Sequence, residues 1–298
     1  MRMSNTLAIV AVLSLGSAAL AQNSGVVLTD GDAVFRFGST TATTLFPTSA
    51  TSSSRVSFDH RINGGATGVD HGFDMQWYLG LDGRAREFTL SGYSSRTTVG
   101  TNQVTYSFEN AFGITGLQAS VTATLVDAAF GADTSLVTTL LTLTNNSASA
   151  LNNFDAFFSI DNNMGGTSSN DTFSALAFDG GNRVLTQSDS VAVGGPFHSV
   201  LYGYGADASG AGNFSALSAQ FTDTGADFTA LADLGSAGSA ATADYGQMMQ
   251  WRRSLAVGES VMLRADIIAS IGATAAIPAP GVLAILGVFG LVGCRRRR

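Results

Sequence analysis

The chain has 298 residues, only 12% of them charged, and 22 acidic residues outnumber 15 basic ones, all of which are arginine. Five of those arginines lie in the two end segments, so the middle of the chain carries a charge of 10 − 22 = −12, which argues against nucleic-acid binding. The single cysteine, Cys294, lies near the C-terminus, which excludes a disulfide bond or thiol catalysis within the preceding residues.

The first 21 residues have the pattern of a secretory signal peptide. Arg2 is followed by an apolar run over positions 7–20, and Ala19 and Ala21 form an A-x-A cleavage site. The run is too short for an ordinary membrane-spanning helix. We therefore expect the export translocon to carry the chain out of the cytoplasm and signal peptidase to cut it after Ala21.

Residues 22–275 are predicted to form one β-sandwich domain. Apolar and polar residues alternate strictly over positions 117–125, as expected for a strand with one buried and one wet face. Many short strands without a long amphipathic helix favour an all-β fold, a large two-sheet sandwich of supersandwich or jelly-roll kind. Two small-residue stretches, 205–213 and 234–242, are predicted to be loops within it. Further strands are predicted at residues 33–37, 56–62, 75–81, 86–92, 104–109, 136–144, 154–160, 173–178, 197–204, 221–231, 251–255 and 261–268.

A loop rich in oxygen-bearing side chains follows the strand predicted at 154–160. It contains Asp161, Asn163 and Asp171 around a Gly-Gly pair, and Ca²⁺ takes about six to eight oxygen ligands of this kind. The spacing departs from the EF-hand loop, since Thr172 stands where that loop ends in glutamate. Two interpretations stay open, a calcium site or a turn in which Asp, Asn and Gly serve the backbone. No other cofactor is predicted.

Two Asp-His pairs, at positions 59–60 and 70–71, form a second candidate cluster. A histidine oriented by a carboxylate can act as a base or a metal ligand. The Asn-Gly-Gly turn between the pairs would let them meet on a hairpin, and the alternative is that they are polar residues at strand ends. His198 stands alone and is interpreted as structural.

The tyrosines and tryptophans of the middle segment allow two interpretations. Buried, they form the core; exposed on one sheet face, they would stack on sugar rings. Phosphate-loop, dinucleotide-binding and nucleophile-elbow motifs are absent, so no catalytic residue is assigned. The residues concerned are Trp77, Tyr78, Tyr93, Tyr106, Tyr202, Tyr204 and Trp251.

The last 22 or so residues combine a proline motif, a short apolar helix and a basic end. Pro278, Ala279, Pro280 and Gly281 begin this tail, residues 281–294 are apolar throughout, and the chain closes on four arginines. An apolar segment followed by a basic cluster predicts a membrane helix with its arginines on the cytoplasmic side. The stop-transfer cluster is Arg295, Arg296, Arg297 and Arg298.

This tail, residues 276–298, resembles the PEP-CTERM sorting signal. The chain has Pro-Ala-Pro-Gly where that family usually has Pro-Glu-Pro. The resemblance implies recognition by an exosortase-type sorting enzyme, temporary anchoring in the membrane, and delivery to the cell surface or release outside the cell. It implies no activity for residues 22–275, which look loosely similar to uncharacterised exported β-sandwich proteins and to sandwiches appended to polysaccharide-active enzymes.

The sequence therefore predicts an exported, surface-sorted β-sandwich with a structural, adhesive or matrix role in the cell envelope, and favours a non-enzymatic protein. The alternative is an extracellular protein that binds or cleaves polysaccharide. An aromatic-lined concave face with two carboxylates nearby would favour the alternative, and a closed aromatic core would favour the structural role.

Overall fold

The structure is a computed structural model in which strands make up almost all of the regular structure. It describes residues 26–31, 33–37, 58–60, 69–72, 74–81, 84–88, 94–127, 134–162, 172–179, 182–189, 197–205, 208–212, 228–229 and 246–271. The predicted signal peptide and the predicted sorting tail lie outside these residues. Within them, the only helical element is a short 3₁₀ turn, η3 (Ala111–Gly113).

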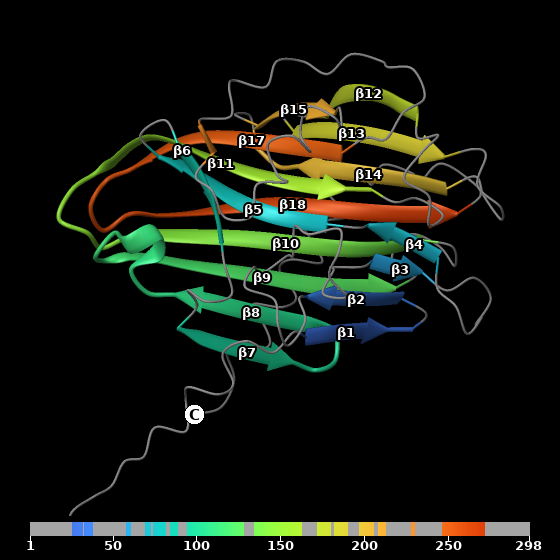
Figure 1. Ribbon diagram of the computed structural model, residues 1–298, viewed down its shortest axis with the longest axis horizontal. Helices are drawn as coiled ribbons and strands as arrows, with labels where there is room; N and C mark the ends of the chain where they lie inside the picture. The colour runs from blue at the N-terminus through green and yellow to red at the C-terminus, as the bar shows by residue number, and fades with distance from the viewer. Residues whose placement is uncertain are drawn as a thin grey trace, which may run out of the picture.

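An eight-stranded antiparallel sheet forms the largest layer, in the order β12-β13-β14-β18-β10-β9-β8-β7. Figure 1 shows it running from β12 and β13 at the top of the view to β7 at the bottom. Its strands are β7 (Ser95–Val99), β8 (Gln103–Phe108), β9 (Leu117–Asp127), β10 (Thr134–Asn145), β12 (Thr172–Asp179), β13 (Asn182–Asp189), β14 (Phe197–Gly203) and β18 (Ser260–Ile271).

Two further antiparallel sheets complete the fold, one of six strands in the order β15-β17-β11-β5-β6-β16 and one of four strands in chain order. The six are β5 (Asp74–Leu81), β6 (Arg84–Glu87), β11 (Leu151–Asp161), β15 (Ala208–Gly212), β16 (Phe228–Thr229) and β17 (Gly246–Leu255). The four are β1 (Val26–Asp30), β2 (Ala33–Phe37), β3 (Phe58–His60) and β4 (Val69–Gly72), at the lower right of Figure 1.

The three sheets share one hydrophobic core. Leu28 of the small sheet, Trp77 of the six-stranded sheet and Leu125 of the eight-stranded sheet all belong to it and are at most 1% exposed. The eight-stranded sheet therefore has its inner face covered by the other two sheets. The all-β, sandwich-like prediction is confirmed, and the small third sheet is an addition to the two sheets expected.

The alternation in β9 fixes which face of the large sheet is buried. Its odd-numbered residues from Leu117 to Leu125 are buried and its even-numbered residues are partly or fully exposed, as predicted. β10 pairs with β9 over eleven residues without a register shift, and its own outward side chains alternate in the same way. A shift of the register by one residue would turn the apolar side chains to solvent and the polar ones to the core. Burial of the apolar side chains therefore also fixes which side chains reach the outer surface.

The prediction of a loop over residues 205–213 is wrong for residues 208–212. These form β15, which pairs with β17 from Ala208 opposite Trp251 to Gly212 opposite Gln247. Alanine, serine and glycine have little preference for strands on their own, and the pairing with β17 overrides that preference.

Candidate functional site

The outer face of the eight-stranded sheet is polar across β7, β8, β9 and β10. It is built from the side chains that alternate with the core residues, so the same period of two that buries the apolar positions exposes a polar set. The outward side chains on β8, β9 and β10 are predominantly hydroxyl or amide groups. They include Gln103, Thr105, Ser107, Gln118, Ser120, Thr122, Thr124, Thr138, Thr142 and Thr144.

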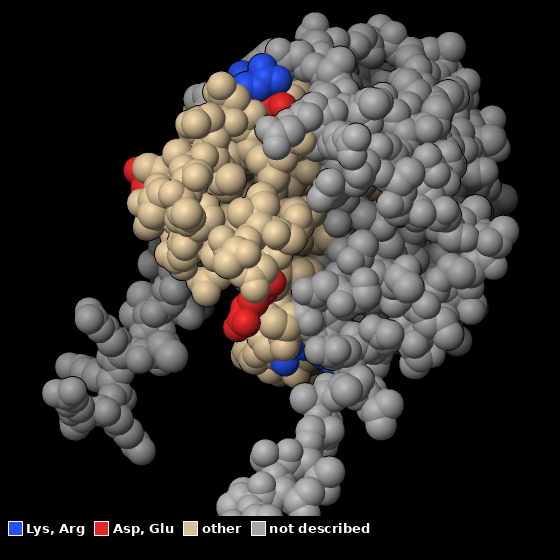
Figure 2. Space-filling model, turned by 60° about the vertical axis from the view of Figure 1, so that its left-hand side comes forward, with Lys and Arg blue, Asp and Glu red and all other residues tan. Residues whose placement is uncertain are grey.

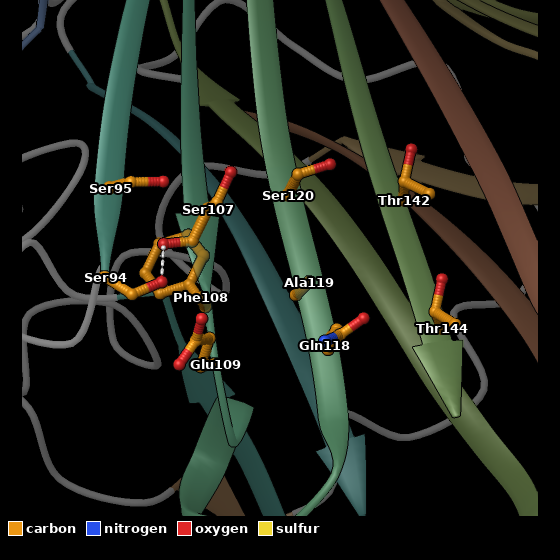
Figure 3. Close-up of a pocket in the computed structure, with 10 residues that line it drawn as sticks. All are labelled: Ser94, Ser95, Ser107, Phe108, Glu109, Gln118, Ala119, Ser120, Thr142 and Thr144. Carbon is orange, nitrogen blue, oxygen red and sulfur yellow. Dashed lines mark hydrogen bonds between the residues drawn. The ribbon is translucent and has the colours of Figure 1, made fainter. Parts of the chain in front are cut away.

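A groove of about 290 Å³ lies on this face near the ends of β8 and β10. Figure 3 shows hydroxyl side chains from four neighbouring strands standing along it. Phe108 and Ala119 contribute to its floor while being almost fully buried. The lining consists of Ser94, Ser95, Ser107, Phe108, Glu109, Gln118, Ala119, Ser120, Thr142 and Thr144.

Four hydroxyl side chains form a straight row across the groove, here named the hydroxyl row: Ser95, Ser107, Ser120 and Thr142 (Figure 3). The strand registers place them directly across from one another, Ser95 opposite Ser107, Ser107 opposite Ser120, and Ser120 opposite Thr142. Directly opposite residues in an antiparallel pair share a face and lie about 4.5–5.5 Å apart. The row is therefore fixed by backbone pairing.

The neighbouring rows differ because their side chains bond to one another. The Thr105 and Thr122 hydroxyl oxygens are 2.8 Å apart, and the Gln103 amide donates to the Thr124 hydroxyl at 2.8 Å. On the other side, Thr144 shares a 2.8 Å hydrogen bond with Ser260. Among the described residues, no side-chain hydrogen bond uses the hydroxyls of the hydroxyl row, so these four keep their donors and acceptors for solvent or a ligand.

The groove is nearly free of charge. Among the described residues of its lining, Glu109 is the only acidic or basic side chain, and it is exposed. Figure 2, which looks at the end of the molecule drawn at the left of Figure 1, shows a mainly uncharged described surface with acidic and basic groups scattered along its margins. A lining of hydroxyls, amides and one carboxylate matches neutral, hydroxyl-rich ligands better than anionic ones.

Further along the same outer face, a buried ion pair separates the polar area from β13 and β14. Arg264 donates to both carboxylate oxygens of Asp266, at 2.9 and 2.7 Å, and the Tyr204 hydroxyl donates to the same carboxylate at 2.7 Å. Asp266 is fully buried, and the guanidinium carbon of Arg264 lies 4.6 Å from the Tyr204 ring centroid. This arrangement is internally satisfied and holds β14 to β18.

The ionisation of this cluster follows from its burial and its charges. Burial and then the Asp266 carboxylate raise the pKa of the Tyr204 hydroxyl far above its usual 10.0. Burial lowers the pKa of Arg264, but the hydrogen bond and charge of Asp266 outweigh it and leave the pKa of the guanidinium above its ordinary value. The guanidinium is thus held charged and the phenol neutral.

The predicted calcium loop lies almost wholly outside the described residues. Asn163 and Asp171 are not described, and the backbone of Asp161 ends β11 directly opposite Asp74 of β5. Within the described part of the chain, no group of three or more His, Cys, Asp or Glu side chains is placed to hold a metal ion. Those residues also include no helix long and apolar enough to cross a membrane.

The two Asp-His pairs do meet on a hairpin. β3 pairs with β4, with Asp59 opposite Asp70 and His60 opposite Val69, and the register shifts between Phe58 and Asp59. His198 lies in β14, opposite Ser188 and Ser270, and forms part of the sheet. The hairpin therefore brings the pairs together, but the groove described above is lined by other strands.

The interpretation of the aromatic residues as core is confirmed for five of the seven. Trp77 and Trp251 pack with ring centroids 5.3 Å apart inside the sandwich, and Tyr204 is half-buried in the ion-pair cluster. Tyr93 lies outside the described residues. The five at 1% exposure or less are Trp77, Tyr78, Tyr106, Tyr202 and Trp251.

Sequence reasoning missed the groove itself. Its signal was present in part, because the polar positions of the 117–125 alternation are mostly serine and threonine, and 103–107 repeats that pattern. No local pattern, however, states that Ser95, Ser120 and Thr142 share a row, since their alignment depends on which strands pair.

No protein-family model matches the chain, and no curated protein matches it. Three solved structures are similar in arrangement. A bacterial glucoamylase complexed with acarbose has 8% sequence identity and a TM-score of 0.45, with 91% of this chain and 35% of that chain covered. A putative kojibiose phosphorylase from the human microbiome has 7% identity and a TM-score of 0.42, with 93% and 34% covered.

The third, a putative aldose 1-epimerase from Escherichia coli K12, has 11% identity and a TM-score of 0.40, with 84% of this chain and 99% of that chain covered. The chain thus spans about a third of the length of the first two structures and nearly the whole of the third.

Proposed function

We propose that this chain is an exported β-sandwich of the cell envelope or extracellular matrix that binds neutral polysaccharide in the groove of its eight-stranded sheet, in an adhesive role and without cleaving it. The observation that carries the proposal is the hydroxyl row, whose four side chains lie in an open groove with their hydrogen-bonding groups unused. Sugars are bound by such donors and acceptors when a rigid scaffold fixes their positions.

The position of the groove on paired strands supports binding of a long ligand. It lies on a sheet whose register is continuous from β7 to β10, so its residues are held in place before any ligand arrives. The sheet face is open to solvent at the edge strand β7, where Ser95, Thr97 and Val99 are exposed. A polymer can therefore enter and leave along the face without a terminus being threaded.

Binding without cleavage is proposed because of the groove's carboxylate content. Glycoside hydrolysis ordinarily uses two carboxyl groups about 5–10 Å apart, one on each side of the scissile bond. Glu109 is the one carboxylate in the described lining of the groove. Incubation with the bound polymer is expected to release no new reducing ends, and their steady release would establish the cleaving alternative instead.

The export route belongs to the same proposal and is supported by the two ends of the sequence. Signal peptidase would cut after Ala21, and an exosortase-type enzyme would act near Pro278 to Gly281. The protein would be held by the apolar helix before processing and would then stay at the surface or be released. Mass spectrometry of the protein from its native cell tests this, since a mass that retains Arg298 would contradict processing of the tail.

Affinity electrophoresis of the purified protein in gels that contain soluble neutral or anionic polysaccharide tests the binding. A neutral polymer is expected to retard the protein, and an anionic one is expected to retard it less because Glu109 and the acidic chain repel it. Ser120→Val should weaken the retardation, whereas Thr98→Ala, on the opposite side of β7 from Ser95 and Thr97, should leave it unchanged. Equal mobility in all gels would refute the proposed function.

A further inference from the structure

The hydroxyl row is periodic, and its period is the spacing between strands. Its members come from four adjacent strands, β7, β8, β9 and β10, and lie directly across from one another. Neighbouring strands in a sheet are about 4.7–4.9 Å apart. A ligand that lies along the row, across the strands, therefore meets one serine or threonine hydroxyl at each such step.

On β8 and β9, the described hydroxyls that take part in no side-chain hydrogen bond are confined to this row. In the row on one side, Thr105 and Thr122 are hydrogen-bonded to each other. In the row on the other side, Thr144 is hydrogen-bonded to Ser260. A ligand that lay along a strand, instead of across the strands, would cross these satisfied groups and find few donors available. The arrangement of hydrogen bonds therefore favours a ligand that lies across the strands over one that lies along a strand.

An extended chain of β-linked hexopyranose units has a matching repeat. In such a chain each sugar ring advances by a length close to the strand spacing. Successive rings are turned over, but each ring carries equatorial hydroxyls at both of its edges, so every ring presents a hydroxyl to the row. An α-1,4-linked chain of the same sugar curls into a helix, so its successive rings cannot all contact a straight row of hydroxyls. Shape alone can therefore distinguish two polymers of identical composition.

The row ends differently at its two sides. At Ser95 the row reaches β7, the edge strand of the sheet among the described strands. Beyond Thr142 the next side chain across is Met262 of β18, which is 64% exposed. An exposed methionine at the end of a polar row offers an apolar contact for the flat face of a sugar ring.

We propose that the groove takes an extended, neutral, β-linked hexose chain lying across the strands, with one sugar unit at each of Ser95, Ser107, Ser120 and Thr142. The proposal rests on the proposed polysaccharide binding and adds the linkage, the direction and the length of the bound segment. Each hydroxyl contributes one hydrogen-bonding contact, so affinity grows with chain length until the row is filled.

Isothermal titration of the full chain with β-1,4-linked glucose oligomers of two to six units, and with α-1,4-linked oligomers of the same lengths, tests this. Affinity for the β-linked series is expected to rise about three- to tenfold per added sugar up to four or five units and then to level off. The α-linked series is expected to show no such rise.

Two variants, one at each end of the row, test whether the oligomers bind along the row. Ser95→Ala should lower affinity for the four-unit oligomer by about three- to tenfold while leaving affinity for the two-unit oligomer unchanged. Thr142→Val should do the same from the other end. Thr98→Ala, on the same edge strand but on its reverse side, is the control and should leave every affinity unchanged.

The outcomes separate the two proposals. If β- and α-linked oligomers bind equally well, or affinity does not change with length, the cross-strand arrangement is wrong although polysaccharide binding stands. If no neutral oligomer or polymer binds, the proposed function itself is wrong. Length dependence that is unaffected by Ser95→Ala and Thr142→Val would place the binding on another face and overturn the assignment to the row.

Discussion

At the scale of single residues, Asp266 is a tightly held charge on the eight-stranded sheet. It is fully buried and accepts hydrogen bonds from Tyr204 and from two nitrogens of Arg264. Removing one partner from such a cluster leaves the other partner's charge uncompensated, which costs more than the cluster contributes as a whole.

Asp266→Asn is therefore expected to lower the free energy of unfolding by about 3–5 kcal/mol, because the Arg264 guanidinium, 18% exposed, loses its counter-charge. Asp155→Asn is the matched control, since its partner Arg252 is 49% exposed and such pairs contribute less than about 1 kcal/mol. Urea denaturation of both variants measures the difference. Equal losses would show that burial does not set the strength of the Arg264–Asp266 pair.

The raised pKa of Tyr204 predicts a loss of stability in alkali. The folded protein holds the phenol proton more tightly than the unfolded chain does, so the unfolded chain binds fewer protons above its own pKa of about 10. The free energy of unfolding is then expected to fall above that pH by up to about 1.4 kcal/mol per unit. Below pH 10 the contribution of the protonated Tyr204 to the free energy of unfolding is fully present.

Tyr204→Phe isolates this effect, since it removes the titrating group and the hydrogen bond to Asp266. The variant is expected to be less stable than the parent chain at neutral pH, and the gap should close as the pH rises above 10. Thermal unfolding followed between pH 7 and 11 measures it. A gap that is constant over this range would contradict the raised pKa.

At the scale of elements, Asn145 joins two connections that run between the large sheets at one end of the sandwich. Its side-chain amide donates to the carbonyls of Ser149 and Leu255, at 2.9 and 3.1 Å, and its backbone pairs with Glu259 and Gly258. The turn after β10 and the turn after β17 are thereby tied together. Asn145 is fully buried, so each of these hydrogen bonds replaces one that water would otherwise make.

Asn145→Ala should lower the free energy of unfolding by about 2–4 kcal/mol, because the carbonyls of Ser149 and Leu255 lose their donor in a buried place. The next residue supplies the control. Asn146 is exposed, and its side chain makes a single 3.2 Å hydrogen bond to Gln118, so Asn146→Ala should cost less than about 1 kcal/mol. Chemical denaturation of the two variants measures both losses of unfolding free energy. Similar losses would contradict the role given to Asn145.

Elements with one buried face were predictable, because the period of two is visible in the sequence. β9 is the clearest case, with its odd positions buried throughout from Leu117 to Leu125. β7 was missed because four of its five residues are exposed, which leaves no alternation to read. β13 was missed because two of its inward positions, Gln187 and Asp189, are polar although fully buried.

At the scale of the whole molecule, the all-β class was predictable from composition and strand spacing, whereas the aromatic residues allowed either a buried or an exposed position. The third sheet and the groove were not, because both depend on pairings between segments far apart in the chain. Thr142 joins the hydroxyl row only because β10 pairs with β9, and Ser95 only because β7 pairs with β8. The sequence therefore predicted β8, β9 and β10 but neither β7 nor the row that the four strands form together.

The proposed binding surface lies on the eight-stranded sheet, and the interior of the molecule has a structural role. Trp77 and Trp251, the residues best suited to sugar stacking, are fully buried, so a sugar must be held by hydroxyl and amide groups. Binding of this kind is built from individually modest hydrogen bonds, and strong attachment then requires several sugars on one chain or several copies of the protein on one polymer.

The most direct test is a map of backbone amide chemical shifts during titration with a β-1,4-linked glucose hexamer. The amides that shift most are expected to lie on β7, β8, β9 and β10 around Ser95, Ser107, Ser120 and Thr142, while the shifts of β5, β11 and β17 are expected to stay unchanged. Shifts centred on the six-stranded sheet, or no shifts at millimolar hexamer, would contradict the central claim that the groove binds polysaccharide.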